Sequence, residues 1–90
     1  MFKSIQDIKY AVDSGQKVCW KSNIYQVKKD RLGQYLIVCI HNNHCSGLTW
    51  NITAQEYEHK YNKEVSKYVF VDETGEVLNG KLEDFFVADS

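Results

Sequence analysis

Two cysteines and two histidines are concentrated in one short stretch of the chain, at Cys39, His41, His44 and Cys45. Asn42-Asn43 separates the histidines, and asparagine tolerates the positive φ that a tight two-residue hairpin turn requires. Such a turn would pair His41 with His44 and place Cys39 on the same face of the hairpin. Thiolate and imidazole groups bind zinc, so these three residues are candidate metal ligands, with His59 or Cys19 as a fourth.

Two features of the same stretch favour a simpler interpretation. Cys45 would point to the face opposite Cys39, and the spacing Cys-x-His-x2-His-Cys differs from the paired Cys-x2–4-Cys and His-x3–5-His ligands of common zinc modules. The alternative is a buried Cys39 with two surface histidines beside a turn. We therefore predict no metal and no cofactor, and keep Cys39, His41 and His44 as the residues to check.

The sequence also offers little support for catalysis. A nucleophilic cysteine needs a neighbouring base and a cleft that lowers the thiol pKa. Cys19 adjoins Trp20, and Cys39 lies in an apolar run where burial would raise the pKa. The chain has no Gly-x-Ser-x-Gly motif and no phosphate-binding glycine loop. The prediction is that the protein is not an enzyme.

Charge is distributed unevenly along the 90 residues, although the net charge is only −1. The first third is basic, and its lysines alternate with aromatic rings in a way that small nucleic-acid-binding barrels use. The residues of this candidate surface are Trp20, Lys21, Tyr25, Lys28, Lys29, Arg31 and Tyr35. Because nucleic-acid-binding domains are usually strongly basic, we treat nucleic-acid binding as the alternative function.

The last part of the chain is acidic, and a polar helix predicted before it carries two tyrosines four residues apart. Negative surfaces attract basic partners, and tyrosines are frequent contact residues. The candidate partner-binding residues are Asp72, Glu73, Glu76, Glu83, Asp84, Tyr57 and Tyr61. Non-enzymatic protein binding is therefore the favoured function.

The elements that must position these residues follow from local patterns. Residues 4–14 are predicted to form a helix, because Ser4 and Asp7 suit its start, Gly15 suits its end, and apolar residues recur on one face. Strands are predicted at 17–21 and 24–28, separated by a turn at Ser22-Asn23. The apolar run at 35–40 predicts a strand covered on both faces, and extended structure resumes at 47–50.

The second half of the chain begins with a capping box, in which Thr53 precedes Glu56 by three residues. A polar surface helix should follow over residues 56–64, attached by Tyr57 and Tyr61. Residues 68–71 are predicted to form a strand, 72–75 a turn and 76–78 a returning strand. Leu82, Phe85, Phe86 and Val87 should form a closing apolar patch on the core.

Together these elements predict one α+β domain over residues 1–90. The expected architecture is an antiparallel β-meander or small curled barrel, with an N-terminal helix and a second polar helix. No run reaches the roughly 20 apolar residues that a membrane helix needs. Three cysteines without a repeated spacing suit a reducing compartment, so the predicted location is cytoplasmic.

Several short motifs resemble small uncharacterised proteins encoded by bacteriophages and prophages. They are Val18-Cys19-Trp20-Lys21, Tyr25-Gln26-Val27, Gly33-Gln34-Tyr35-Leu36-Ile37, Gly47-Leu48-Thr49, Leu78-Asn79-Gly80 and Glu83-Asp84-Phe85-Phe86. Relative to that pattern, residues 51–67 are an insertion. The resemblance implies an accessory protein in the cytoplasm of a bacterial host cell, of the kind that inhibits a defence complex, as anti-CRISPR proteins do. The implied partner is a host protein or nucleoprotein complex, and a homodimer is an open alternative.

Overall fold

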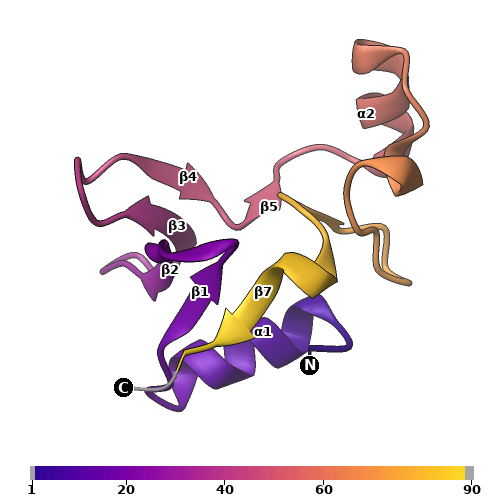
Figure 1. Cartoon of the computed structure of the whole chain (residues 1–90). Helices are drawn as coiled ribbons and strands as arrows, with labels where there is room; N and C mark the ends of the chain where they lie inside the picture. The colour runs from indigo at the N-terminus through magenta and orange to yellow at the C-terminus, as the bar shows by residue number, and fades with distance from the viewer. Residues whose placement is uncertain (1, 89–90) are drawn as a thin grey trace.

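The computed structural model describes residues 2–88 of the chain and shows a helix packed on a five-stranded sheet, with a smaller unit beside them (Figure 1). In chain order the elements are α1 (Ile5–Asp13), β1 (Val18–Trp20), β2 (Ser22–Lys29), β3 (Tyr35–Cys39), β4 (Cys45–Gly47), β5 (Thr49–Trp50), α2 (Ala54–Tyr61), the 3-10 turn η1 (Val65–Lys67), β6 (Val77–Leu78), the 3-10 turn η2 (Leu82–Asp84) and β7 (Phe85–Val87).

The large sheet has the strand order β4-β3-β2-β1-β7, and all neighbouring strands are antiparallel. The two short strands β5 and β6 pair separately. The predicted α+β class, the meander and the N-terminal helix are therefore confirmed. The barrel alternative is wrong, because β4 and β7 are the two edges of an open sheet.

Helix α1 forms as its sequence predicts. The Ser4 hydroxyl accepts a hydrogen bond from the Asp7 N–H at 3.1 Å, and the Asp7 carboxylate accepts one from the Lys3 N–H at 3.0 Å. Gly15 has φ +85°, which lets the chain leave the helix in a left-handed conformation. Ile5, Ile8 and Ala11 are buried, so one face of the helix packs on the sheet.

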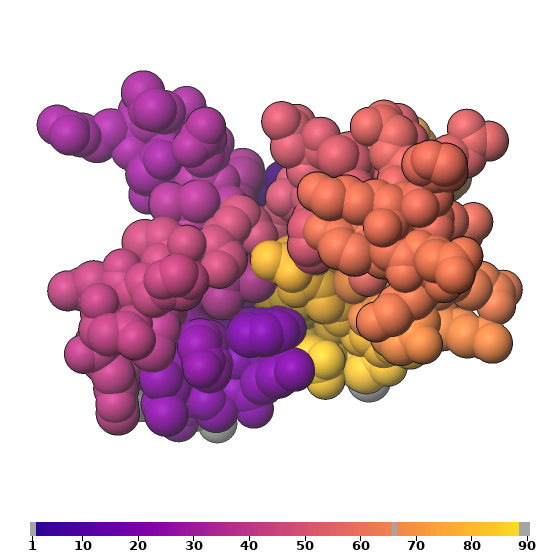
Figure 2. Space-filling view, turned by 90° about the horizontal axis from the view of Figure 1, so that it is seen from above, coloured from indigo at the N-terminus to yellow at the C-terminus, as the bar shows by residue number. Residues whose placement is uncertain are grey.

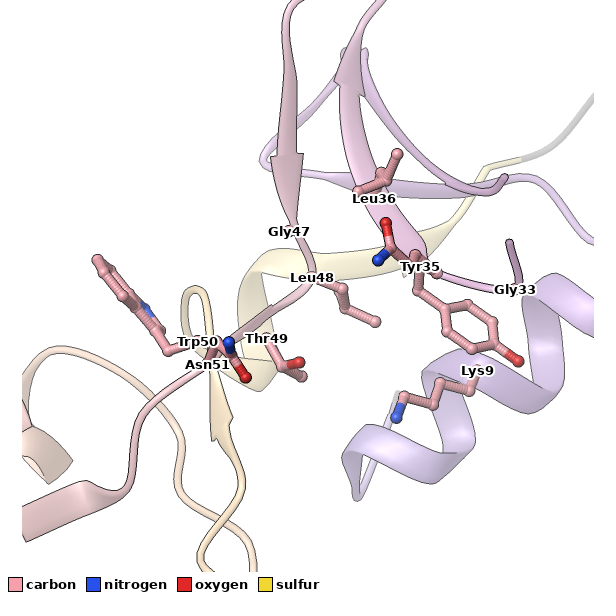
Figure 3. A pocket seen from close by; sticks show the side chains of 10 residues that line it. Lys9, Gly33, Tyr35, Leu36, Gly47, Leu48, Thr49, Trp50 and Asn51 are labelled. Carbon is pink, nitrogen blue, oxygen red and sulfur yellow. The ribbon is translucent and has the colours of Figure 1, made fainter. Parts of the chain in front are cut away.

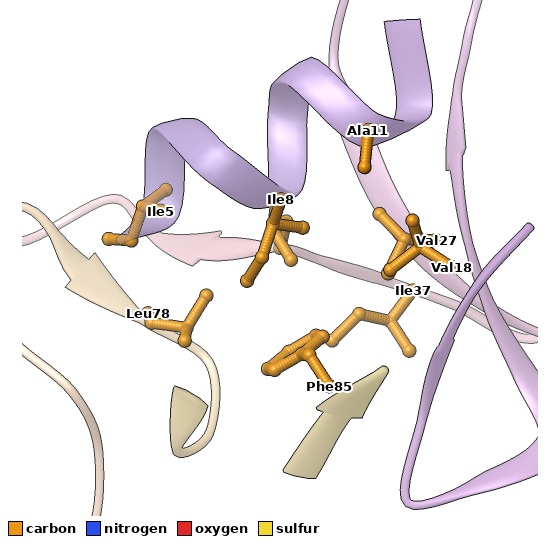
Figure 4. Packing of buried hydrophobic residues seen from close by; sticks show 9 residues of the cluster. Ile5, Ile8, Ala11, Val18, Val27, Ile37, Leu78 and Phe85 are labelled. Carbon is orange, nitrogen blue, oxygen red and sulfur yellow. The ribbon is translucent and has the colours of Figure 1, made fainter. Parts of the chain in front are cut away.

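The main core lies between α1 and one face of the sheet. Figure 4 shows Ile5 and Ile8 pointing from the helix towards Leu78 and Phe85, and Ala11 towards Val18 and Val27. The buried residues of this cluster are Ile5, Ile8, Ala11, Val18, Val27, Ile37, Leu48, Leu78 and Phe85. The segment between β4 and β5 and the end of β6 therefore contribute to the same core as the sheet.

A second, smaller core joins α2 to the rest of the chain. Both bonds of the predicted capping box are present, and α2 ends at Asn62, which has φ +51°. The helix is therefore shorter than the predicted 56–64. Tyr57 is buried with Val65, Val69 and Val77, and its ring lies 5.6 Å from the Trp50 ring. As predicted, tyrosines attach a polar helix to the surface.

Two local predictions are wrong, and a third is confirmed only in part. The turn at Ser22-Asn23 is absent because β2 begins at Ser22, and the chain reverses at Lys21, which has φ +62°. Residues 68–71 do not form a strand, apart from an isolated bridge between Val71 and Val77, because Val69 is drawn into the second core. The predicted closing patch of Leu82, Phe85, Phe86 and Val87 is confirmed in part, because Phe85 is buried in the main core and Leu82 packs against it, whereas Phe86 and Val87 are exposed on strand β7.

No helix within residues 2–88 is both long enough and apolar enough to cross a membrane.

Candidate functional site

The predicted metal ligands are only partly brought together. The Cys39 N–H donates to the His44 carbonyl at 2.8 Å, so Cys39 faces His44 and the four residues 40–43 form the connection between strands. The predicted pairing of His41 with His44 is therefore wrong, and His41 lies exposed in the loop. Cys45 is opposite Val38 on the other face of the sheet, as expected. Within residues 2–88, no group of three or more His, Cys, Asp or Glu side chains could hold a metal ion.

Cys39 and His44 instead line a small cavity of about 200 Å³ on the core side of the sheet. The other residues around it are Trp20, Tyr25, Ile37, Ser46 and Asn79. The Asn79 side chain in this lining already has a hydrogen-bond partner, because its Nδ2 donates to the Gly47 carbonyl at 3.0 Å.

The thiols of the chain are free, and burial raises the pKa of Cys19 despite the nearby Lys17 charge. Cys19 therefore has no feature of a reactive thiol.

The rings of the nucleic-acid alternative lie on the core side of the sheet and already have partners. Trp20 and Tyr25 make an edge-to-face contact at 5.3 Å, and the Lys21 ammonium lies 4.6 Å from the Trp20 ring centre. The Tyr35 hydroxyl donates to the Asp13 carboxylate at 2.8 Å, and Lys29 contacts the same carboxylate at 3.4 Å. Hydrogen bonds to Tyr35 and then Asp13 raise the pKa of Lys29. Outside this network, Lys28 and Arg31 are exposed.

The acidic residues proposed for partner binding have different environments. The Asp72 carboxylate accepts hydrogen bonds from the Thr74 hydroxyl at 2.7 Å and from the Glu76 N–H at 2.9 Å. Burial alone would raise the pKa of Asp72, but these bonds, with those from the Thr74 and Gly75 backbone, outweigh burial and lower it. Asp72 therefore organises the turn before β6. Glu76 is paired with Lys9 of α1 at 3.2 Å.

The remaining members of that set divide into exposed and internal side chains. Glu73 and Glu83 are exposed, Asp84 is half-buried, and Tyr61 keeps part of its ring at the surface. Tyr57 is buried in the second core. Internal contacts thus engage Asp72, Glu76 and Tyr57, and these residues hold the fold before any partner binds.

An open hollow of about 480 Å³ lies where α1, the start of β3 and the β4–β5 segment meet (Figure 2). In the close view, Lys9, Thr49 and Asn51 surround it (Figure 3). Lys9 is engaged by Glu76, and its ammonium lies 5.4 Å from the Tyr35 ring. The lining therefore offers polar contacts, but it does not place a nucleophilic side chain beside a general base.

The outer face of the sheet, opposite α1, is defined by the strand register. Residues that face one another across antiparallel strands share a side of the sheet. The central row is Phe86–Cys19–Gln26–Val38–Cys45, from β7 to β4. On one side of this row Lys28 faces Leu36, and on the other the Ile40 N–H bonds to the Ile24 carbonyl. Figure 3 shows Leu36 pointing away from α1 while Tyr35 points towards it.

This outer face is mostly apolar and no helix or second sheet packs on it among the described residues, although Cys19 in its central row is fully buried. Ile24, Ile40 and Phe86 are 37%, 44% and 36% exposed, and Cys45 is exposed. Leu36 and Val38 are half-buried, but neither belongs to, nor packs against, a core cluster. An antiparallel sheet with one free face normally alternates apolar and polar residues along its strands. Strand β3 departs from this rule, because both of its faces are apolar.

The signal for this site was present in the sequence, in the unbroken apolar run at 35–40. That run predicts cover on both faces. Within the described chain only the side that carries Tyr35, Ile37 and Cys39 is covered, by α1 and the segments that follow β4 and β6. The prediction of a fully buried strand is therefore wrong for the isolated chain.

Comparisons with known proteins do not place the chain in a family: no family model, no curated protein and no solved structure matches it.

Proposed function

We propose that this protein acts by binding another protein, and that the outer face of the five-stranded sheet is its contact surface. The observation that carries this proposal is the apolar, uncovered side of β3, formed by Leu36, Val38 and Ile40. Exposed apolar side chains that gather on one face of a sheet, as Ile24, Ile40 and Phe86 do here, are a feature of docking sites. A partner that buries these apolar side chains removes them from water, and this hydrophobic burial favours binding.

The chemistry of the face favours a protein over a nucleic acid. Among the outer-face residues defined above, Phe86 is the sole aromatic ring and Lys28 the sole charge. Binding of single strands needs several stacking rings and a basic path for phosphates. The rings of the basic segment, Trp20, Tyr25 and Tyr35, are engaged on the other side of the sheet.

The biological setting stays a prediction from the resemblance to phage and prophage proteins. In that setting the partner is a host protein or nucleoprotein complex of bacterial defence, and binding inhibits it by occlusion. The contact surface proposed from the geometry is the outer face, in place of one centred on Asp72, Glu76 and Tyr57, because internal contacts engage those side chains.

An affinity capture from bacterial extract tests the proposal with matched variants. Ile24→Lys/Ile40→Lys places two charges on the outer face, whereas Leu32→Lys changes an exposed apolar residue of the β2–β3 loop. Mass spectrometry should identify a protein that the wild type and Leu32→Lys retain and that the double variant loses at least tenfold. Equal recovery with all three baits would refute the outer face as the contact surface.

A further inference from the structure

We infer that the free edge of β7 binds an extended segment of another protein, which joins the five-stranded sheet as a further strand. This edge is a different surface from the outer face, so the inference goes beyond the proposed function and either can fail without the other. Figure 1 shows β7 at one margin of the sheet, and β1 is its one paired neighbour among the described strands. Strand addition to such an edge is a recurring mode of peptide recognition.

The strand register determines which backbone groups of β7 point away from β1. In an antiparallel pair, successive residues direct their N–H and C=O groups alternately towards the neighbouring strand and away from it. The Asp84 carbonyl accepts a hydrogen bond at 2.7 Å from the residue after β1, and the Ala88 N–H donates at 2.8 Å to the residue before β1. Asp84, Phe86 and Ala88 therefore direct their backbone groups towards β1, and Phe85 and Val87 direct theirs outward.

Three of these outward groups have no hydrogen-bond partner within residues 2–88. The Phe85 N–H donates to the Leu82 carbonyl of η2, which leaves the Phe85 carbonyl and both backbone groups of Val87. Unpaired groups at a sheet edge form a template for another strand. An antiparallel segment would place one residue opposite Val87 and exchange two hydrogen bonds with it. The residue two positions further along the segment would donate to the Phe85 carbonyl.

The other edge of the same sheet is partly covered by the chain itself. At the end of β4, the Gly47 carbonyl accepts a hydrogen bond from the Asn79 side chain at 3.0 Å. Sheet edges are also commonly protected by charged residues, prolines or bulges. Strand β7 has the sequence Phe-Phe-Val and pairs with β1 without a register shift, so it carries none of these protections. The edge of β7 is therefore the one suited to strand addition.

A hollow of about 410 Å³ lies along this edge and indicates which side chains the added segment should carry. Phe2, Phe85, Phe86 and Val87 line it, with Glu83 as the charged residue among the described lining. Phe85 belongs to the main core and Phe2 packs against that core, so the fold holds these apolar rings in place. Residues directly opposite one another on antiparallel strands share a side of the sheet. The segment residues opposite Val87 and Phe85 should therefore be apolar.

Glu83 indicates the charge that the segment should carry. It is exposed and precedes β7 by two residues. A segment residue two positions beyond the one opposite Phe85 would lie near the Glu83 carboxylate, which attracts a basic side chain and repels an acidic one. The occupant is therefore an extended segment with two alternate apolar residues, followed two positions later by lysine or arginine.

Two capped synthetic peptides test the inference by NMR on the isotope-labelled protein. Both alternate threonine with two valines, and two positions after the second valine one peptide carries lysine and the other glutamate. We expect the lysine peptide, titrated to about 2 mM, to bind and to slow hydrogen exchange of the Val87 N–H about tenfold. The Phe86 N–H, which already faces β1, should change little. The glutamate peptide should bind about fivefold more weakly.

Matched variants separate the backbone contact from the charge contact. Val87→Pro removes the outward N–H, and proline is tolerated where the N–H of an edge strand faces solvent, so pairing with β1 should remain. It should weaken binding about tenfold, whereas Val87→Thr keeps the N–H and should bind as the wild type does. Glu83→Lys should reverse the preference between the peptides, and Glu73→Lys, the same change at an exposed residue outside the hollow, should not. Urea unfolding checks that each variant folds.

The inference is overturned if neither peptide slows exchange at Val87, or if Val87→Pro and Val87→Thr lose binding equally. If Val87→Pro does not fold, the reversal by Glu83→Lys decides. Ile24→Lys/Ile40→Lys, which changes the outer face, should bind the lysine peptide as the wild type does, and a loss there would contradict binding at the edge. Exchange at Val87 that slows with rising protein concentration alone would make a second copy the occupant and overturn a separate partner. The capture from bacterial extract decides the proposed function independently, because its variants leave β7 unchanged.

Discussion

The most informative stability experiment compares two isoleucines of the same segment that face opposite sides of the sheet. Ile37 lies in β3, points into the main core and is 4% exposed, whereas Ile40 follows β3 on the outer face and is 44% exposed. Substituting each by alanine removes the same atoms. The two free energies of unfolding should nevertheless change by different amounts, because the surroundings of the two side chains differ.

The expected sizes follow from burial. Ile37→Ala removes a fully packed side chain and leaves a cavity, which costs about 2–5 kcal/mol. Ile40 is a little over half buried, and water fills the space it leaves, so about half of the ~1.5–3 kcal/mol of a buried isoleucine is lost without a cavity contribution. Ile40→Ala should therefore cost about 1 kcal/mol. A chain of this length has roughly 5–13 kcal/mol in total, so Ile40→Ala should fold, whereas the largest cost expected for Ile37→Ala equals the lower end of that total.

Urea unfolding measures both free energies. Equal costs for Ile37→Ala and Ile40→Ala would refute the account, because Ile40 would then be covered within the isolated chain.

Two further predictions concern the turn before β6, which contains Asp72, and the contact between Gly80 and Trp20 after β6. The carboxylate of Asp72 has a pKa below its ordinary 3.8, so its contribution to stability is complete above that pH and is lost as the pH falls through the lower native value. Asp72→Asn should therefore unfold more easily than the wild type at pH 7, and the difference should shrink below pH ~4 and vanish in stronger acid; a difference independent of pH would contradict the role of the charge. Gly80→Ala should cost about 1–3 kcal/mol and shift the tryptophan fluorescence, because an added Cβ would lie 2.7 Å from Trp20 Nε1. Gly75→Ala is the control, since its Cβ would meet nothing within 4 Å, and an equal loss there would assign the effect to backbone conformation alone.

Elements whose signals are local could be predicted from the sequence. Helix α1 is framed by Ser4 and Gly15, and α2 by its capping box at Thr53. The bonds that form these caps join residues three or four positions apart, so the tertiary environment does not alter them. The turn at 72–75 belongs to the same class, because the Asp72 side chain binds the backbone two and four residues on.

Features that depend on distant partners could not be predicted. Phe85-Phe86-Val87 becomes a strand by pairing with β1, more than sixty residues earlier in the chain. The loop at 40–43 is longer than the Asn42-Asn43 pair suggests, because the Asn42 side chain accepts the His44 N–H at 2.9 Å and Asn43 donates to the Cys39 carbonyl. Lys21 makes the β1–β2 reversal with its N–H bonded to Asp84, a residue close to β7.

The candidate site combines both cases. The apolar run at 35–40 announces a strand that is apolar on both sides, but the sequence does not show whether the chain itself supplies both covers. Composition predicts the acidic set, but it does not reveal that Glu76 pairs with Lys9 of α1. The outer face depends on the pairing of distant strands, because only the strand register brings Phe86, Val38 and Cys45 into one row.

The labelling rate of Cys45 in the captured complex tests the central claim most directly. Cys45 lies exposed on the outer face, while Cys19 and Cys39 are buried and provide an internal baseline in the same chain. Maleimide modification of Cys45, followed by peptide mass spectrometry, should be at least tenfold slower in the complex than in free monomer of the same sample. A rate that is the same in the free and bound protein would show that the partner binds elsewhere.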